Sequence, residues 1–184
     1  MARLLKTIVL VGMMGAGKTV VGGQLATILD APFVDSDDKI MEAAQRTIPE
    51  IFERDGEPFF RDRETEVLRR LVAGTTCVLS TGGGAFMSEL NRDIIKEAGV
   101  SVWLDVELDV LWERVRQKVN RPLLQSKNSY ATLKSIYDAR VGTYRLADIS
   151  VQSRPELSVV NMAEKVLNAV LSRQDLFEED KTWL

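Results

Sequence analysis

A glycine-rich segment near the start of the chain constrains the fold more than any other feature. Residues 12–19 read Gly-Met-Met-Gly-Ala-Gly-Lys-Thr, which matches the phosphate-loop pattern G-x-x-x-x-G-K-[ST]. An apolar run over 8–11 precedes the segment and a helical pattern over 18–29 follows it, as the pattern requires. Glycines let backbone N–H groups face inward around a polyphosphate at a helix N-terminus. The segment therefore predicts a site for nucleotide phosphates.

The rest of the chain alternates between strand-like and helix-like patterns. Runs rich in β-branched residues lie at 7–11, 32–34, 76–80, 100–104 and 149–152, and helical patterns lie at 18–29, 57–72 and 158–171. This alternation predicts an α/β fold over one domain, 1–184, with a parallel sheet covered by helices on both faces. Ligands of such folds bind outside the carboxyl ends of the strands. We expect the acidic tail at 174–184 to be loose rather than a surface latch.

Composition excludes several classes of chemistry. The 184 residues include no histidine, so proton handling must fall to carboxylates, and Cys77 is the only cysteine, so no internal disulfide is possible. A net charge of −3 argues against a nucleic-acid partner. Apolar runs are too short to cross a membrane, so we expect a cytoplasmic protein without a membrane partner.

Carboxylates follow two of the predicted strands. Lys18 should reach the β- and γ-phosphates and Thr19 should offer its hydroxyl to Mg²⁺. Asp35 and Asp37 come just after the strand at 32–34, where one could serve the metal and the other an acceptor hydroxyl. The alternatives are an exposed acidic turn or a helix cap formed by Ser36 or Asp37. Asp105, which ends another strand pattern, is a rival for the metal.

Glycines and arginines supply the remaining candidates. The triplet at 82–84 follows a strand and would let a small ligand approach the backbone, unless it is only a flexible turn. Arg61 and Glu64 are one helical turn apart, which suits an oriented guanidinium or a surface ion pair. Arg121 lies in a polar stretch that Pro122 interrupts, which predicts a flap. Arg140 could face solvent or an anionic substrate.

In their order and spacing these segments resemble the shikimate kinase family over nearly the whole chain. The segments are 12–19, 35–37, 51–52, 60–64, 82–84 and 121–124, together with Arg140 and Tyr144. The resemblance implies a P-loop, nucleoside-monophosphate-kinase-like fold with a central five-stranded parallel sheet. It implies a kinase that transfers the γ-phosphoryl group of Mg-ATP to the 3-hydroxyl of shikimate, in aromatic amino-acid biosynthesis. We expect a monomer that binds ATP and shikimate.

The resemblance also implies a role for each matching residue. Lys18, Asp37 and Arg121 would be catalytic, and Thr19 and Asp35 would serve Mg²⁺. The nucleotide would contact Gly12, Gly15, Ala16, Gly17, Lys18, Thr19, Arg114, Arg121 and Arg154. Shikimate would contact Asp37, Phe52, Phe60, Arg61, Glu64, Gly82, Gly83, Gly84, Pro122, Leu123 and Arg140. The lid would span roughly 116–128.

Two other functions remain open. A gluconate or nucleoside-monophosphate kinase would share the architecture but need a different acceptor pocket. A regulatory module could bind ATP without catalysis, although Lys18, Thr19, Asp37 and Arg121 are all present. A GTPase is disfavoured because the sequence contains no N-K-x-D guanine motif.

Overall fold

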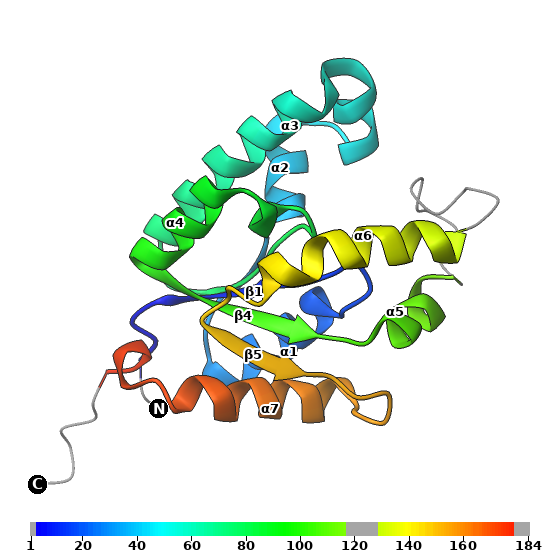
Figure 1. Ribbon diagram of the computed structural model, residues 1–184. Coiled ribbons are helices and arrows are strands. Elements are labelled where there is room, and N and C mark those ends of the chain that lie inside the picture. The colour runs from blue at the N-terminus through cyan, green and yellow to red at the C-terminus, as the bar shows by residue number, and fades with distance from the viewer. Residues whose placement is uncertain (1–2, 117–128, 179–184) are drawn as a thin grey trace, which may run out of the picture.

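Five parallel strands form the centre of the computed structural model, which describes residues 3–116 and 129–178 (Figure 1). They are β1 (Thr7–Val11), β2 (Phe33–Asp35), β3 (Val78–Ser80), β4 (Gly99–Asp105) and β5 (Ile149–Gln152), in the spatial order β2-β3-β1-β4-β5. The sheet confirms the predicted α/β class and all five strands, with boundaries shifted by at most two residues. The chain leaves β1 toward β2 and β3 and later returns to its other side through β4, so the switch point lies beside β1.

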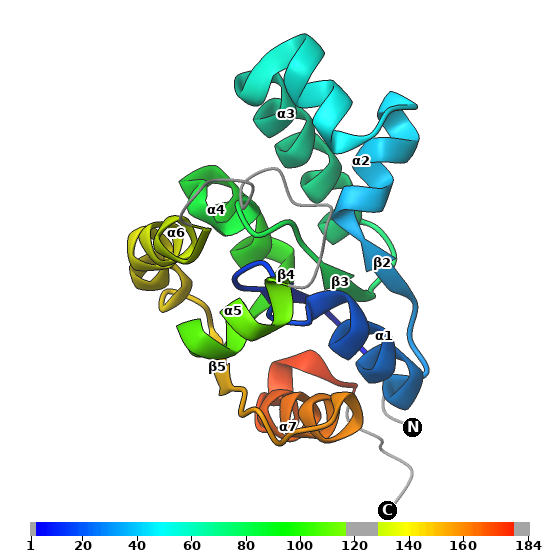
Figure 2. The same ribbon diagram turned by 90° about the vertical axis from the view of Figure 1, so that its right-hand side faces the viewer.

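Helices cover both faces of the sheet, as predicted. They are α1 (Lys18–Leu29), α2 (Ser36–Ala44), α3 (Ile48–Ala73), α4 (Glu89–Ala98), α5 (Leu108–Val115), α6 (Ser129–Tyr144) and α7 (Val159–Leu171). Helices α1 and α7 lie against one face, and α3, α4 and α6 lie over the other (Figure 2). No described helix is both long and apolar enough to cross a bilayer.

The central strands are almost continuously apolar because both of their faces are covered. Every residue of β1 is buried, and β1 pairs with β4 so that Val11 lies opposite Trp103. On the other side β2 pairs with β3 and brings Asp35 opposite Ser80. The last residues of these strands therefore open onto one edge of the sheet.

Helices α2 and α3 project from the sheet with a small apolar cluster of their own (Figure 1). The cluster consists of Ile40, Ile51, Phe60 and Val67. Thr47 begins α3 with a capping box that includes Glu50, and α3 kinks at Gly56, whose φ is 82°. The predicted helix at 57–72 is thus the second part of a longer element.

The prediction of a loose C-terminal tail is wrong for residues 174–178. The amide of Leu5 donates to the Leu176 carbonyl at 2.8 Å, and the amide of Glu178 donates to the Arg3 carbonyl at 2.9 Å. Leu176 is fully buried, and Lys6 pairs with Asp175 at 2.7 Å. Leu176, which lies between acidic residues, packs into the core and fixes the segment to the N-terminal chain. Residues 179–184 lie outside the described residues.

Candidate active site

The phosphate loop occupies the switch point, between the end of β1 and the start of α1. Gly15 and Gly17 have φ values of 82° and 90°, a conformation that favours glycine. The Lys18 ammonium folds over the loop and donates to the carbonyls of Gly12 at 2.8 Å and Met13 at 3.0 Å. The side chain is thereby held above the N-terminus of α1, where backbone amides and the helix dipole favour an anion.

Three oxygen-bearing side chains gather beside the loop. The Thr19 hydroxyl donates to Asp35 Oδ2 at 2.9 Å and lies 3.4 Å from the Ser80 hydroxyl. Asp35 is the N-cap of α2, because its Oδ1 accepts from the amide of Asp37 at 3.0 Å. Oxygen donors of this kind suit Mg²⁺, so the residues present fit that ion. The segment does contain a helix cap, but Asp35 forms it rather than Ser36 or Asp37, and the cap does not exclude a metal role.

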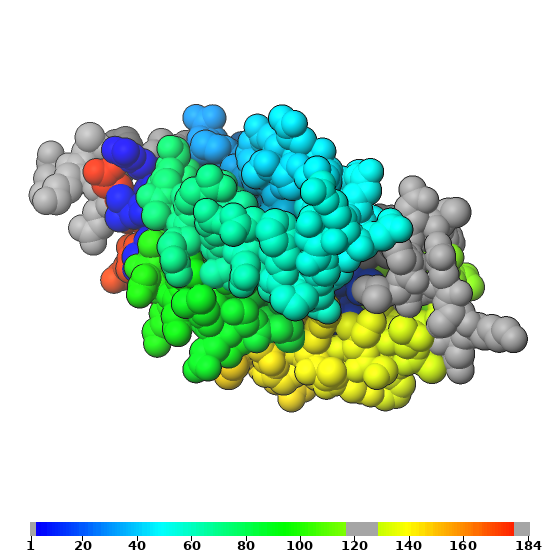
Figure 3. All heavy atoms as spheres, turned by 90° about the horizontal axis from the view of Figure 1, so that it is seen from above, coloured from blue at the N-terminus to red at the C-terminus, as the bar shows by residue number. Residues whose placement is uncertain are grey.

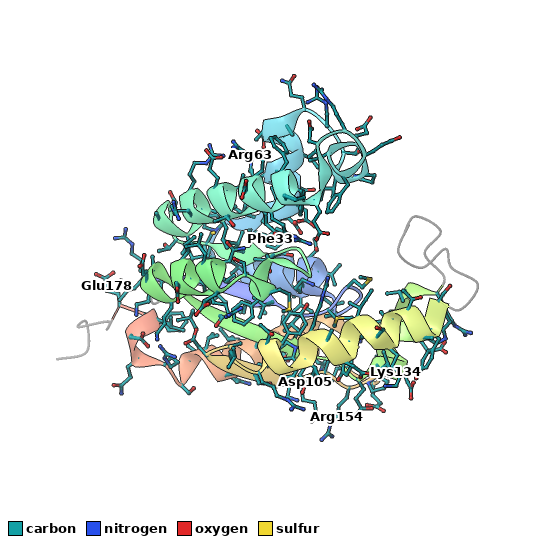
Figure 4. The ribbon with its side chains drawn as sticks, turned by 45° about the horizontal axis from the view of Figure 1, so that its top comes forward. Phe33, Arg63, Asp105, Lys134, Arg154 and Glu178 are labelled. Carbon is teal, nitrogen blue, oxygen red and sulfur yellow. The ribbon has the colours of Figure 1, made fainter. Side chains whose placement is uncertain are left out.

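Asp105, the rival metal carboxylate, lies elsewhere. It ends β4 and does not line the cavity that contains Thr19 and Asp35. Burial raises the pKa of its carboxyl group, while Arg145 opposes the rise. Figure 4 shows Asp105 beside α6. This position favours Asp35 as the carboxylate nearest the phosphate loop.

Asp37 lies in the first turn of α2 with one carboxylate oxygen buried. That atom, Oδ1, has no hydrogen-bond partner among the described residues. Burial raises the pKa of Asp37 from 3.8 to about 6; the charge of Asp35 adds to the rise and Lys18 opposes it. A Cβ placed on Gly82 would lie 2.8 Å from the same oxygen. The carboxylate thus faces a glycine that leaves room for its unpaired atom.

Arg61 is held by two carboxylates of its own helix. Its Nη1 donates to Glu64 Oε2 at 2.8 Å, and Nη2 donates to Glu57 Oε1 at 3.0 Å. Glu64 is only 2% exposed, and burial raises its pKa although Arg61 opposes the rise. A Cβ on Gly84 would lie 2.7 Å from both terminal nitrogens of Arg61. A side chain at position 84 would therefore displace the guanidinium from its present place.

Aromatic and basic side chains complete this wall. The rings of Phe52 and Phe60 are 4.7 Å apart, and the Arg61 guanidinium lies over the Phe60 ring at 5.1 Å. The carbonyl of Gly83 accepts hydrogen bonds from Arg140 Nη1 at 3.3 Å and from the Tyr144 hydroxyl. The glycine turn is thus anchored from α6.

Two cavities meet this turn. One, of about 430 Å³, contains the loop together with Asp35, Asp37, Ser80, Gly82 and Gly83. The other, of about 440 Å³, is lined by Arg61, Glu64, Gly84 and Arg140, among others. Viewed from above, blue atoms of the N-terminal region show between α3 and α6 (Figure 3). The glycine triplet therefore borders both spaces.

The nucleotide side is less completely anticipated by the sequence. Arg114 donates to the carbonyls of Gly15 at 3.3 Å and Ala16 at 3.5 Å and lines the first cavity, and its contact with the nucleotide stays a prediction. Arg154 is exposed, does not line that cavity and points outward in Figure 4. Its neighbour Ser153 lines the cavity instead. Arg121, Pro122, Leu123 and the predicted lid after residue 116 lie outside the described residues.

Sequence reasoning missed three polar residues that the structure brings to the site. Ser80 was not singled out, although it ends a strand at the same edge as Asp35. Ser153 follows β5 and lines the first cavity. Tyr144 was noted only as part of a motif. Position at a strand end was the signal available for both serines, whereas nothing local predicts the contact between Tyr144 and Gly83.

Comparison with known proteins identifies the family. The model of the family described as shikimate kinase matches residues 14–172. The chain is 58% identical to shikimate kinase of Cereibacter sphaeroides over 98% of this chain and 90% of that one. It is 56% identical to shikimate kinase of Ruegeria pomeroyi over 96% and 91% of the two chains. The solved structure of shikimate kinase from Acinetobacter baumannii in complex with shikimate superposes with a TM-score of 0.86 at 40% identity, covering 92% of this chain and 95% of that one. The chain belongs to the shikimate kinase family.

Proposed function

We propose that this protein transfers the γ-phosphoryl group of Mg-ATP to the 3-hydroxyl of shikimate, which yields shikimate 3-phosphate and ADP. One observation carries the proposal: Lys18 of the phosphate loop and the unpaired carboxylate oxygen of Asp37 share a single cavity. A donor phosphate held by the first and an acceptor hydroxyl held by the second would meet there. Phosphoryl transfer needs this in-line juxtaposition more than covalent help from the protein.

On the donor side, the loop amides, Lys18 and Arg114 would bind the nucleotide. Lys18 already lies over the loop, so its ammonium needs only to exchange carbonyl partners for phosphate oxygens. Thr19 and Asp35 would hold Mg²⁺, with Ser80 close by. When bound, that ion would neutralise charge on the β- and γ-phosphates.

On the acceptor side, Asp37 would bind and orient the attacking hydroxyl. Its Oδ1 is buried and has no partner within residues 3–116 and 129–178, which is the state in which a carboxylate accepts a hydrogen bond from a ligand most readily. With a pKa of about 6, the group is ionised at neutral pH yet basic enough to take the proton of the hydroxyl as the bond to phosphorus forms.

Arg61 and Arg140 would bind the carboxylate of shikimate. Both line the second cavity, and Glu64 and Glu57 hold Arg61 in one orientation. Guanidinium groups pair with carboxylates through charge-assisted hydrogen bonds, which gives selectivity for an acidic acceptor. Phe52 and Phe60 would support the ring side, and the backbone of Gly82, Gly83 and Gly84 would approach the hydroxyls.

Three proposed parts of the site lie in the lid, outside the described residues. Arg121 would clamp the transferring phosphate, and Pro122 and Leu123 would close over the acceptor. Closure would keep water from competing with shikimate for the phosphoryl group. We propose that the protein acts as a monomer and that it is located in the cytoplasm.

The test is ADP release from Mg-ATP with shikimate, quinate or gluconate offered separately, together with identification of the phosphorylated product. We expect turnover with shikimate and phosphate on its 3-hydroxyl. Turnover with gluconate alone would mean that the acceptor assignment is wrong. ATP binding without turnover on any hydroxy acid would instead favour a regulatory module.

A further inference from the structure

Tyr144 makes a hydrogen bond to which the proposed reaction assigns no role. It ends α6, is 1% exposed, and its hydroxyl donates to the carbonyl of Gly83. Burial raises the pKa of this hydroxyl to about 12, so it remains a proton donor at all working pH values. The carbonyl of Gly83 therefore has a permanent partner from the opposite side of the site.

The ring of Tyr144 rests on a second aromatic residue. It stacks on Trp103 of β4 with ring centroids 6.1 Å apart and an interplanar angle of 18°. Trp103 is itself 6% exposed and lies beside Val11, the last residue before the phosphate loop. Both rings are thus fixed in the core rather than at the surface.

Each end of this pair contacts one half of the site. A Cβ on Gly12 would lie 3.3 Å from Trp103 Cδ1, so the loop begins directly against the indole. A Cβ on Gly83 would lie 3.4 Å from the Met14 amide nitrogen and 3.6 Å from the Gly12 carbonyl oxygen. The loop, the indole, the phenol and the glycine turn are therefore close neighbours around a ring, with room for about one methyl group between Gly83 and the loop.

We propose that Trp103 and Tyr144, here called the aromatic strut, set the separation between the phosphate loop and the glycine turn. Tyr144 is then a positioning residue for phosphoryl transfer, because it holds the acceptor wall at a fixed distance from the donor. The inference rests on the proposed function and adds a determinant of transfer geometry to it. Small errors in such juxtaposition are costly, because transfer needs the reacting atoms held near contact.

A second consequence concerns Arg140, which shares the Gly83 carbonyl with Tyr144. Without the phenol hydroxyl, Arg140 is the remaining side chain that bonds this carbonyl in the described residues. Its guanidinium is then drawn toward Gly83 and away from the acceptor carboxylate. Loss of the strut's hydroxyl should therefore weaken acceptor use and leave nucleotide binding intact.

The test is Tyr144→Phe, which removes the hydroxyl that donates to the Gly83 carbonyl and interacts with Arg140, and keeps the stacked ring. We expect kcat/KM for the acceptor to fall roughly tenfold, the loss expected for one hydrogen bond to a buried carbonyl. KM for ATP should stay within about twofold, since nucleotide contacts are untouched. The ratio of ADP released to phosphorylated acceptor should rise above its wild-type value, because a displaced acceptor lets water compete.

The matched control is Tyr137→Phe, which removes the same hydroxyl from the same helix two turns earlier, where no described hydrogen bond is lost. It should behave as wild type. Equal losses in both variants, or a Tyr144→Phe enzyme whose coupling ratio and acceptor KM are unchanged while only total velocity falls, would overturn the strut. A fall in total velocity alone is what a smaller folded fraction of the enzyme would produce.

Trp103→Phe tests the other half. If the two rings act as one unit, the double variant should lose less than the product of the two single losses. Independent, multiplicative losses would refute a shared strut. All of these variants are compared with wild type on whichever acceptor the wild-type enzyme phosphorylates. The aromatic strut can therefore be tested even if the acceptor is not shikimate.

Discussion

Replacing Asp37 by asparagine should abolish turnover and at the same time stabilise the protein at neutral pH. The folded-state pKa of about 6 lies above the ordinary value of 3.8. A raised pKa means that the folded chain binds a proton at this carboxyl group more tightly than the unfolded chain does. Stability from this group is therefore complete below about pH 4 and is lost as the pH rises through about 6. Asparagine carries no charge and escapes that loss.

The magnitude follows from the size of the pKa shift. About 2 pKa units at 1.36 kcal/mol each correspond to roughly 3 kcal/mol at pH 7, an upper limit because Lys18 loses a favourable neighbour and the amide needs its own partner. For a chain of this size, 1 kcal/mol shifts the melting temperature by roughly 2–4 °C. We therefore expect the melting temperature of Asp37→Asn to exceed that of the wild type by several degrees at pH 7.

The assay is chemical and thermal denaturation of both proteins between pH 4 and 8. The stability difference should be largest at pH 7 and shrink toward zero near pH 4, where the wild-type carboxyl group is also neutral. Asp38→Asn is the control: it removes a charge from the same first turn of α2, but from an exposed side chain, and should change stability by less than about 1 kcal/mol. An Asp37→Asn protein that is no more stable than wild type at pH 7, or whose advantage does not vary with pH, would refute the reasoning.

Three further predictions concern the acceptor. If Asp37 takes the proton of the acceptor hydroxyl as proposed, kcat/KM for shikimate should be level above about pH 7 and fall about tenfold per unit below about pH 6. A profile that is flat from pH 5 to 7 would contradict the role. Arg61→Ala should raise KM for shikimate at least tenfold, because a charge-assisted hydrogen bond is lost. The control Arg63→Ala, on the exposed side of the same helix, should leave this KM unchanged. Equal affinities of Arg61→Ala and wild type for shikimate in a calorimetric titration would contradict the prediction. Gly84→Ala should likewise raise this KM, because its Cβ would displace the Arg61 guanidinium, while steady-state kinetics of Gly142→Ala, whose Cβ would meet nothing within 4 Å, should match wild type.

Sequence patterns predict the sheet well because its strands carry their signal locally. A parallel strand covered on both faces reads as an uninterrupted apolar run, so β1 was located to the residue. The edge strand β5, which is partly exposed, was located by its β-branched residues instead. Helix α2 was missed because it is short and its start looks like an acidic turn. Only the cap by Asp35 reveals that the same residues both begin a helix and face the loop. The phosphate loop needed no tertiary information, since its pattern is contiguous.

The acceptor half could be predicted only as a set of separate candidates. Arg61 and Glu64 looked like an ordinary i, i+3 surface pair, and their burial depends on α3 packing across the glycine turn. Arg154, which only the family resemblance suggested, does not line the first cavity. Long-range contacts of this kind are set by how elements pack, and no local pattern encodes them.

The buried polar atoms of the site lower the stability of the fold at the place where the proposed reaction would occur. The described residues contain four buried side-chain oxygens without partners, and two of them, Asp37 Oδ1 and Glu64 Oε1, converge on Gly82. Each unpaired buried atom costs roughly 1–3 kcal/mol, and a fold selected for stability alone would pair or replace them. In the proposed complex the same atoms would regain partners from a hydroxylated ligand, so the cost would be recovered on binding. An acceptor analogue without hydroxyls should therefore bind far more weakly than its loss of contact area implies, because both carboxylates would stay unpaired in its complex.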